Sequence, residues 1–230
     1  MRSAIRGAVE AMPGGDPLLK IYRALRGKHV RPAEHRGYVG GMWEEIGTAQ
    51  FAFMIRQGLT PQDILVDVAC GSLRGGSLFI AYLDPGHYLG LDHNSWLIEA
   101  GLKYEISGGL RHSKRPEFVI SDRFEFQAFG KHPNWGLAQS LFSHLNKDDI
   151  RLCLVNLRAH MKPGGRFFAT FIPRGFLPEG YVNPEQSGDT SAFQYEGEEI
   201  LAIGREAGWQ ARYIGESGHP RGQEMLEFLA

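Results

Sequence analysis

The 230-residue chain lacks several features that would assign a protein to a class at once. It has only two cysteines, Cys70 and Cys153, which excludes a disulfide framework and favours a reducing compartment. No apolar run reaches the ~18 residues that a membrane-spanning helix needs, and the first residues lack the apolar centre of a signal peptide. The expected location is therefore the cytoplasm, with no membrane span.

Strong charge of one sign is also missing. The formal net charge is −1, so there is no global electrostatic reason to expect a nucleic-acid partner. Only residues 1–36 depart from this balance, with eight basic and three acidic side chains. A solvated helix face is the simpler interpretation of this basic segment. An acidic partner, or the acidic face of a second copy in a homodimer, is the alternative.

Signatures of several enzyme classes are absent too: there is no Walker A loop, no HExxH, no GxSxG and no paired CxxC. Internal repeats and low-complexity segments are also missing. With 43% hydrophobic and 22% charged residues, the composition is that of an ordinary globular protein. The length suits one α/β domain. We expect a helical extension over residues 1–58, which could cover a ligand, and a main domain over residues 59–230.

What is present is an alternation of strands and helices. Apolar runs predict strands at 64–69, 88–92, 118–120, 137–142 and 167–172. Helical patterns predict helices at 16–27, 42–57, 77–83, from a cap at Ser95, from a cap at Asn146 to Met161, and up to Ala207. Repeated βα winding implies an open parallel sheet. Two short strands at 211–215 and 224–228 are too close for a crossover helix, so we expect an antiparallel pair at one edge.

The strongest local signal is the segment Asp67–Gly76, with the sequence DVACGSLRGG, between a buried strand and a helix. A glycine turn in this place lets the backbone approach a ligand closely, and the helix that follows favours a negative group. By itself this is weak evidence, because strand-to-helix turns also use glycine for conformational reasons alone.

In this segment the chain resembles motif I of the class I methyltransferases, which bind S-adenosylmethionine (SAM). Ala69 and Leu73 stand where the family has the first and third glycines of its pattern. The resemblance implies a Rossmann-like seven-stranded, mostly parallel sheet with helices on both faces and a reversed last strand. It also implies that the cofactor contacts Asp67, Ala69, Gly71 and Ser72.

Later segments follow the family's order. Asp92 ends the next strand, where a carboxylate can accept both ribose hydroxyls, and His93 follows it. Asp122 and Arg123 resemble the motif that meets adenine, and Ser140 lies in the fourth motif. A capping or turn aspartate is the competing interpretation for Asp92 and for Asp122.

Methyl transfer to an alcohol needs a base, because an alcohol is a poor nucleophile at neutral pH. His144 follows the fourth strand and is the candidate general base; histidines ordinarily titrate near pH 6.5. Ordering of the local loop is its competing role. The Asn-Pro-Pro-aromatic signature of DNA-amine methyltransferases is absent.

Regions expected to surround the acceptor are rich in aromatic, acidic and imidazole side chains, which suit a polyhydroxylated ligand such as a sugar or oligosaccharide. The six expected to contact it are His35, Tyr38, Trp43, Glu45, Arg174 and Tyr195, and the wider set adds Glu44, His132, Trp135, Phe176, Tyr181 and Phe193. Packing is the alternative role for each of them.

The segment His35–Gly47, together with the CGSLRGG loop, resembles small bacterial O-methyltransferases of glycan assembly. That resemblance leaves room for a divalent cation such as Mg²⁺ near the acceptor, with no ligands assigned. The alternatives are methylation of a lipid or small natural product, a nicotinamide-dependent oxidoreductase, and a protein that binds a nucleoside without turnover.

Overall fold

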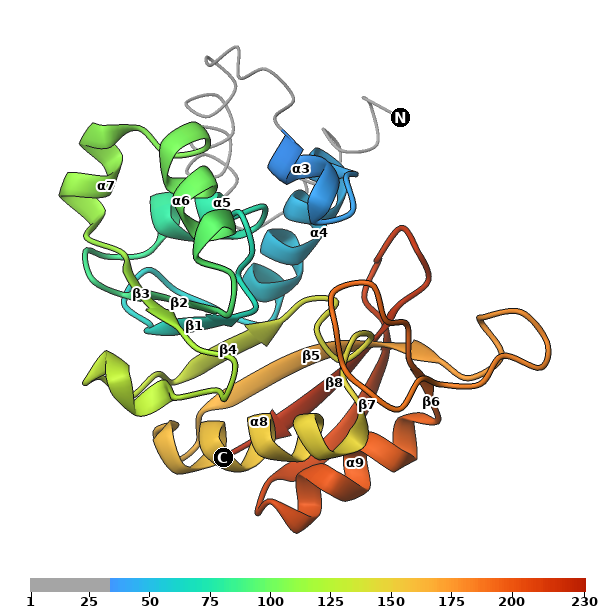
Figure 1. Cartoon of the computed structure of the whole chain (residues 1–230). Helices are drawn as coiled ribbons and strands as arrows, with labels where there is room; N and C mark the ends of the chain where they lie inside the picture. Colours follow the sequence, from blue (N-terminus) through green and yellow to red (C-terminus); the bar gives the residue numbers. More distant parts are fainter. Residues whose placement is uncertain (1–33) are drawn as a thin grey trace.

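Five parallel strands form the centre of the molecule in the computed structural model, which describes residues 34–230 (Figure 1). They lie in the order β3-β2-β1-β4-β5. Their bounds are β1 Leu65–Val68, β2 Tyr88–Asp92, β3 Glu117–Ile120, β4 Trp135–Ala138 and β5 Arg166–Pro173. Every residue of β1, β2 and β4 is buried, which explains why these strands are apolar apart from Asp67 and Asp92.

The last two long strands reverse the direction of the sheet. The strand β8 (Glu224–Leu229) pairs antiparallel with β5, and β7 (Gln210–Glu216) pairs antiparallel with β8 at the edge. A two-residue strand, β6 (Gln194–Tyr195), adds to the end of β5. The predicted antiparallel pair and the reversed last strand are thus confirmed. They bring the β7–β8 loop to the edge where the parallel strands end, because Glu224 pairs with Phe171 late in β5.

Helices cover both faces of the sheet (Figure 1). One face carries α4, α5, α6 and α7, and the other carries α8 and α9. The bounds of the helices are α3 Glu34–Tyr38, α4 Trp43–Arg56, α5 Gly76–Tyr82, α6 Ser95–Tyr104, α7 Gly108–Lys114, the 3-10 turn η1 Phe126–Phe129, α8 Lys147–His160 and α9 Gly197–Glu206. No helix within residues 34–230 is both long enough and apolar enough to cross a membrane.

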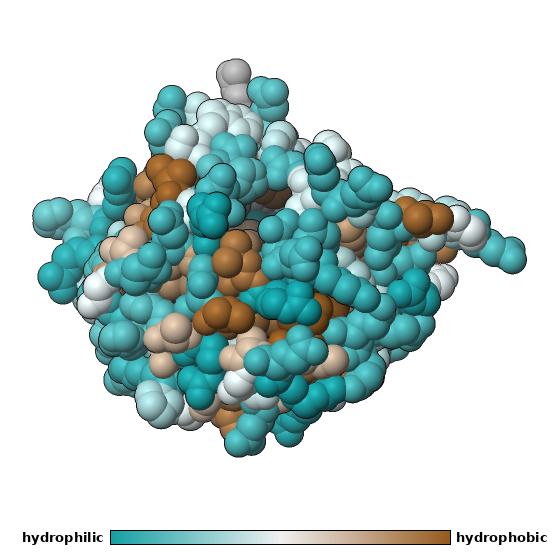
Figure 2. All heavy atoms as spheres, turned by 60° about the horizontal axis from the view of Figure 1, so that its bottom comes forward, coloured by the Kyte–Doolittle hydropathy of each residue, from teal (hydrophilic) through white to brown (hydrophobic). Residues whose placement is uncertain are grey.

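Alternating side chains divide the core into two layers. Leu65 of β1 faces the layer of α4 and α5, whereas Val66 and Val68 face the layer of α8 and α9. Phe51 and Met54 anchor α4 in the first layer. Figure 2 shows the side of α8 and α9 as mostly hydrophilic with separate apolar patches, as expected of amphipathic helices.

Most predicted elements are present, with bounds that differ by a few residues. The strand predicted at 137–142 is a clear miss, because β4 begins at Trp135 and ends at Ala138. The chain turns there at Ser140, whose φ of 63° is left-handed. Asn94, not Ser95, occupies the cap position of α6, whereas Asn146 caps α8 as predicted. The short α3 and α7 were not predicted, and the helix predicted at 16–27 lies outside the described residues.

Candidate functional site

A cavity of about 320 Å³ opens at the edge where β1, β2 and β4 end. This is where open α/β sheets bind ligands. Its walls come from the loops after those strands, from the segment before α4, and from the β5–β6 and β7–β8 loops. Lining residues include Tyr38, Val39, Gly40, Gln50, Asp67, Ala69, Cys70, Gly71, Ser72, Arg74, Asp92, His93, Leu97, Gln139, Ser140, His144, Asp189, Arg221 and Gln223.

The loop after β1 alternates through left-handed backbone conformations. Ala69, Gly71 and Leu73 have φ of 60°, 53° and 68°. These are the three positions at which the methyltransferase pattern has glycine. A left-handed residue with a side chain costs about 1–2 kcal/mol, and complete burial of Leu73 in the α4 and α5 layer offsets this cost. Ala69 and Leu73 therefore adopt a backbone conformation that glycine adopts without strain.

Asp92 joins this loop to the end of β2. Its carboxylate accepts the backbone N–H of Gly71 at 2.8 Å and that of Asn94 at 2.9 Å. Burial raises the pKa of Asp92, and these two backbone hydrogen bonds oppose the rise. The carboxylate holds the loop and also lines the cavity.

Asp67 lies deeper, in β1, and its carboxyl accepts the Tyr88 hydroxyl at 2.7 Å. Burial raises the pKa of Asp67 to about 7, against the effect of this hydrogen bond. Asp67 is therefore only partly ionised at neutral pH, whereas an exposed aspartate would be fully ionised.

The cover segment, Tyr38–Gly41, forms the roof of the cavity. Gly40 and Gly41 have φ of 86° and 63°, so the segment turns its carbonyl groups toward two arginines. Arg74 Nη1 donates to Val39 O at 2.8 Å and to Gly41 O at 3.3 Å. Arg221, from the β7–β8 loop, donates to Gly40 O.

A second connection holds the cover segment on the other side. The Tyr38 hydroxyl donates to Asp189 at 2.6 Å, and His93 Nε2 lies 3.2 Å from the same carboxylate. We call Tyr38, Asp189 and His93 the clasp. It joins the cover segment, the β5–β6 loop and the residue after Asp92. Nothing in the sequence around Asp189 indicated this role, since only tertiary structure brings the three segments together.

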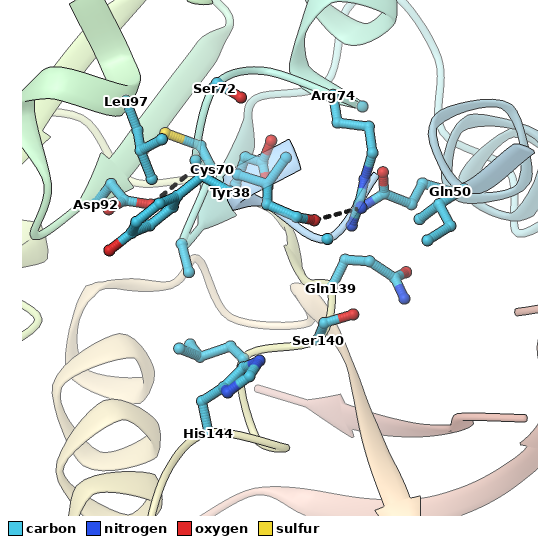
Figure 3. Close-up of a pocket in the computed structure, with 18 of the residues that line it drawn as sticks. Tyr38, Gln50, Cys70, Ser72, Arg74, Asp92, Leu97, Gln139, Ser140 and His144 are labelled. Carbon is cyan, nitrogen blue, oxygen red and sulfur yellow. Dashed lines mark hydrogen bonds between the residues drawn. The ribbon is translucent and has the colours of Figure 1, made fainter. Parts of the chain in front are cut away.

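The loop after β4 carries His144 at the cavity wall opposite the β1 loop (Figure 3). His144 Nδ1 lies 2.6 Å from Ser191 O. Because a carbonyl oxygen can only accept, Nδ1 must hold the proton, which leaves the Nε2 lone pair free to accept one. The Ser140 N–H and hydroxyl bond to Thr170 (2.7 Å) and Gln223 (3.0 Å), which fixes this loop.

The structure brings together most of the residues predicted to bind the cofactor. Asp67, Ala69, Gly71, Ser72, Asp92, His93 and Ser140 line the cavity with His144. Asp122 and Arg123 are exposed and do not line it. There the turn is organised by Ser121, whose hydroxyl accepts the N–H groups of Arg123 and Glu125. Contact of Asp122 with adenine stays a prediction.

Of the six residues predicted to contact the acceptor, only Tyr38 lines the cavity. His35 is buried, stacks on Tyr104 and meets Trp43 edge to face, so this cluster docks α3 on α6. Glu45 is exposed and Arg174 pairs with Glu196 and Glu199. Buried Tyr195 donates to Leu145 O at 2.7 Å.

The other residues predicted around the acceptor also lie outside the cavity lining. Glu44, Phe176 and Tyr181 are exposed and Phe193 is buried in the core, all outside the cavity lining. Trp135 and His132 lie at the opposite end of the sheet, because β4 begins at Trp135. The sequence predicted that this strand starts at residue 137, whereas β4 starts two residues earlier, and this places both residues at its beginning, away from the cavity.

Several cavity residues escaped the sequence analysis. Gln50, Gln139, Arg221 and Gln223 are single polar residues in otherwise ordinary elements, and nothing in their local pattern distinguishes them. Arg74 lies within the glycine loop itself, so its position was a usable signal.

Within residues 34–230, no group of three or more His, Cys, Asp or Glu side chains is arranged to hold a metal ion. The described residues therefore do not fit the divalent cation that the resemblance allowed.

No model of a known protein family matches the chain. Solved structures, however, share its architecture. A glycopeptide N-methyltransferase in complex with S-adenosylhomocysteine is 17% identical, with a TM-score of 0.61 over 81% of this chain and 90% of that one.

Two further structures are similar in the same way. The magnesium protoporphyrin IX methyltransferase of Synechocystis PCC 6803, with bound SAM, is 15% identical with a TM-score of 0.60 over 92% of this chain and 90% of that one. Fibrillarin of Aeropyrum pernix, also with SAM, is 12% identical with a TM-score of 0.55 over 81% of this chain and 76% of that one. With its reversed strand β8 between β5 and β7, the chain has the Rossmann-like fold of class I methyltransferases.

Proposed function

We propose that the chain is a SAM-dependent methyltransferase. The observation that carries this proposal is the left-handed loop Ala69–Leu73 bound to Asp92 at the wall of the cavity. A backbone that approaches a ligand closely, next to a carboxylate at the end of the second strand, suits a nucleoside with an extended tail. A Cβ at Gly71 would lie 3.1 Å from Val39 Cγ1, so glycine there lets the cover segment pack closely over the loop.

Bound SAM would supply an electrophilic methyl group for an in-line displacement. In the proposed arrangement, Asp92 accepts hydrogen bonds from the ribose hydroxyls, and the loop after β1 lies along the amino-acid tail. The protein must then orient the acceptor and exclude water, which the cover segment does from above. His144 Nε2 takes the proton of an attacking hydroxyl, because the bond from Nδ1 to Ser191 O leaves that nitrogen as an acceptor.

We further propose a hydroxyl of a sugar or oligosaccharide as the acceptor. Amides, a hydroxyl and an imidazole line the cavity around the β4 loop, as suits a polyhydroxylated ligand: Gln139, Ser140, His144 and Gln223. The chain also resembles the 1-O-methyltransferase of mycobacterial methylmannose polysaccharides in the segments quoted above. A lipid or apolar natural product would be better served by a more apolar wall.

The test has two stages. Calorimetric titration with SAM, S-adenosylhomocysteine and NAD should show binding of the first two and at least tenfold weaker binding of NAD. Transfer of a labelled methyl group from SAM to short mannosides, a fatty acid and an amine should then favour the mannosides. Tighter binding of NAD would replace the methyltransferase by an oxidoreductase, and binding without transfer to any acceptor would favour a binding protein.

A further inference from the structure

Arg74 is a partly buried cation without an anionic partner among the described residues. It lies just after the β1 loop and lines the cavity, and its hydrogen bonds to described residues use Nη1 alone, to two carbonyl groups of the cover segment. Its Nε is buried with no hydrogen-bond partner. Burying a guanidinium is costly unless an anion balances it.

The nearest carboxyl does not neutralise Arg74. Asp67 is bonded to Tyr88, and burial raises its pKa to about 7, so it carries only part of a charge at neutral pH. Burial, and then the charge of Arg221, lower the pKa of Arg74 to about 10, which still leaves it protonated. The cavity therefore holds a full positive charge at this end.

A second unpartnered polar group lies beside Arg74. Gln50, from α4, is 7% exposed, lines the cavity and has an Oε1 atom without a partner. That oxygen lies 2.6 Å from where a Cβ on Gly75 would be, so glycine is needed for the close approach. Figure 3 shows Arg74 and Gln50 on one side of the β1 loop and Asp92 on the other.

We propose that Arg74 forms a carboxylate-binding subsite at the end of the cavity opposite Asp92. Gln50 Oε1 can only accept a hydrogen bond, so it suits the ammonium group of the same ligand. A guanidinium binds a carboxylate through charge-assisted hydrogen bonds. This inference rests on the proposed function, because the carboxylate assigned to it is that of the amino-acid tail of SAM. The ligand then extends from Asp92, under the β1 loop, to Arg74. Because Arg74 also holds the cover segment, a bound carboxylate and a closed roof depend on the same side chain.

The test compares two ligands that differ in that tail. S-adenosylhomocysteine carries the carboxylate, and 5′-methylthioadenosine has the same nucleoside and sulfur without the amino-acid group. Calorimetry on the full chain gives the ratio of their two Kd values. We expect the wild type to prefer S-adenosylhomocysteine at least tenfold and Arg74→Gln to reduce that preference below threefold.

Two variants keep the result interpretable. Arg221→Gln removes the other arginine bound to the cover segment and should retain the wild-type preference, even if both affinities fall. Arg74→Lys keeps the positive charge but lacks the paired N–H groups of the guanidinium, so it should show an intermediate preference. It replaces Arg74→Gln as the test if the glutamine variant folds poorly.

A preference that survives in Arg74→Gln would overturn the proposal, and this is the result expected if Arg74 instead binds a carboxylate of the acceptor. A wild type that binds both ligands equally would also overturn it. A wild type that binds neither ligand would overturn the proposed function itself. Binding of methylthioadenosine alone would leave a nucleoside site in place and remove only the carboxylate subsite.

Discussion

The β1 loop and the cover segment enclose the same cavity with similar backbone conformations but are held in different ways. Both contain left-handed residues, namely Ala69, Gly71 and Leu73 in the loop and Gly40 and Gly41 in the cover segment. The loop is continuous with a buried strand, and Leu73 is completely buried beneath it. The cover segment depends on side chains that reach it from distant parts of the chain: Arg74, Asp189 and Arg221.

This difference separates a fixed wall from a roof that can open. Moving the β1 loop would expose core side chains, whereas releasing the cover segment breaks hydrogen bonds at its rim and exposes little apolar surface. Tyr38 is already 52% exposed. We infer that the wall positions the cofactor and that the roof controls entry and release. The following predictions test this division, beginning with the largest effect.

The largest effect is expected on the rate of methyl transfer, from a change at His144 in the loop after β4. His144→Ala should lower the rate of methyl transfer at least a hundredfold, because a positioned base contributes typically 10²–10⁴-fold. Affinity for S-adenosylhomocysteine should change little, measured by calorimetry beside single-turnover rates. His112→Ala, on exposed α7, is the matched control. More than a tenth of the wild-type rate in the variant would assign proton removal to another group.

Asp67 should make the fixed wall sensitive to pH. Its pKa of about 7 in the folded chain lies above the unfolded value of about 3.9. The folded state therefore favours the protonated form. The resulting stability is complete below about pH 4 and is lost as the pH rises toward 7, by up to about 1.4 kcal/mol per pH unit.

Asp67→Asn cannot ionise and should lose this slope. Urea unfolding at several pH values between 4 and 8 measures it, with Asp122→Asn, at an exposed aspartate outside the cavity lining, as the comparison. Equal slopes in the wild type and the Asp67 variant would show that Asp67 ionises normally.

Asp92 joins the wall to the ligand. Asp92→Ala should weaken SAM binding more than tenfold, since hydrogen bonds to a charged group contribute about 1.5–3 kcal/mol. Asp122→Ala is the informative comparison, because the sequence predicted a cofactor contact there and the structure places Asp122 outside the cavity lining. Unchanged affinity in Asp92→Ala would make Asp92 a purely structural residue.

Weakening the contacts that hold the cover segment should have a smaller effect, confined to the rate at which the cofactor product is released. Tyr38→Phe and Asp189→Ala each remove the same hydrogen bond of the clasp, so each should speed release of S-adenosylhomocysteine about threefold, the equivalent of a weak exposed hydrogen bond. Stopped-flow displacement measures the rate. The double variant should match either single one, and additive effects would mean that the two residues act separately.

The smallest effect is expected for Ala69→Gly in the β1 loop, with Leu73→Gly in the same loop as its contrast. Ala69→Gly removes left-handed strain of about 1–2 kcal/mol. It also raises the conformational entropy of the unfolded chain, which costs about 0.5–1 kcal/mol of stability. The free energy of unfolding should therefore rise by less than about 1 kcal/mol. Leu73→Gly relieves the same strain yet loses a buried side chain, and should be destabilising by about 2–5 kcal/mol. Thermal unfolding distinguishes the pair; a destabilised Ala69→Gly would show that the loop takes another path.

Sequence patterns alone determined the βα winding, the reversed strand pair and the sheet edge that carries the cavity, because burial on both faces and short connections leave a direct imprint on local composition. The residues of the β1 loop, Asp92 and His144 were found for the same reason, since each follows a strand. The tertiary structure decided the rest. Asp189, Arg221 and Gln223 reach the cavity from loops whose paths depend on packing, and His35 and Trp43 proved to anchor α3 because a buried cluster forms beside Tyr104. Local sequence records what a strand or helix must bury, but it does not record which distant side chain meets it.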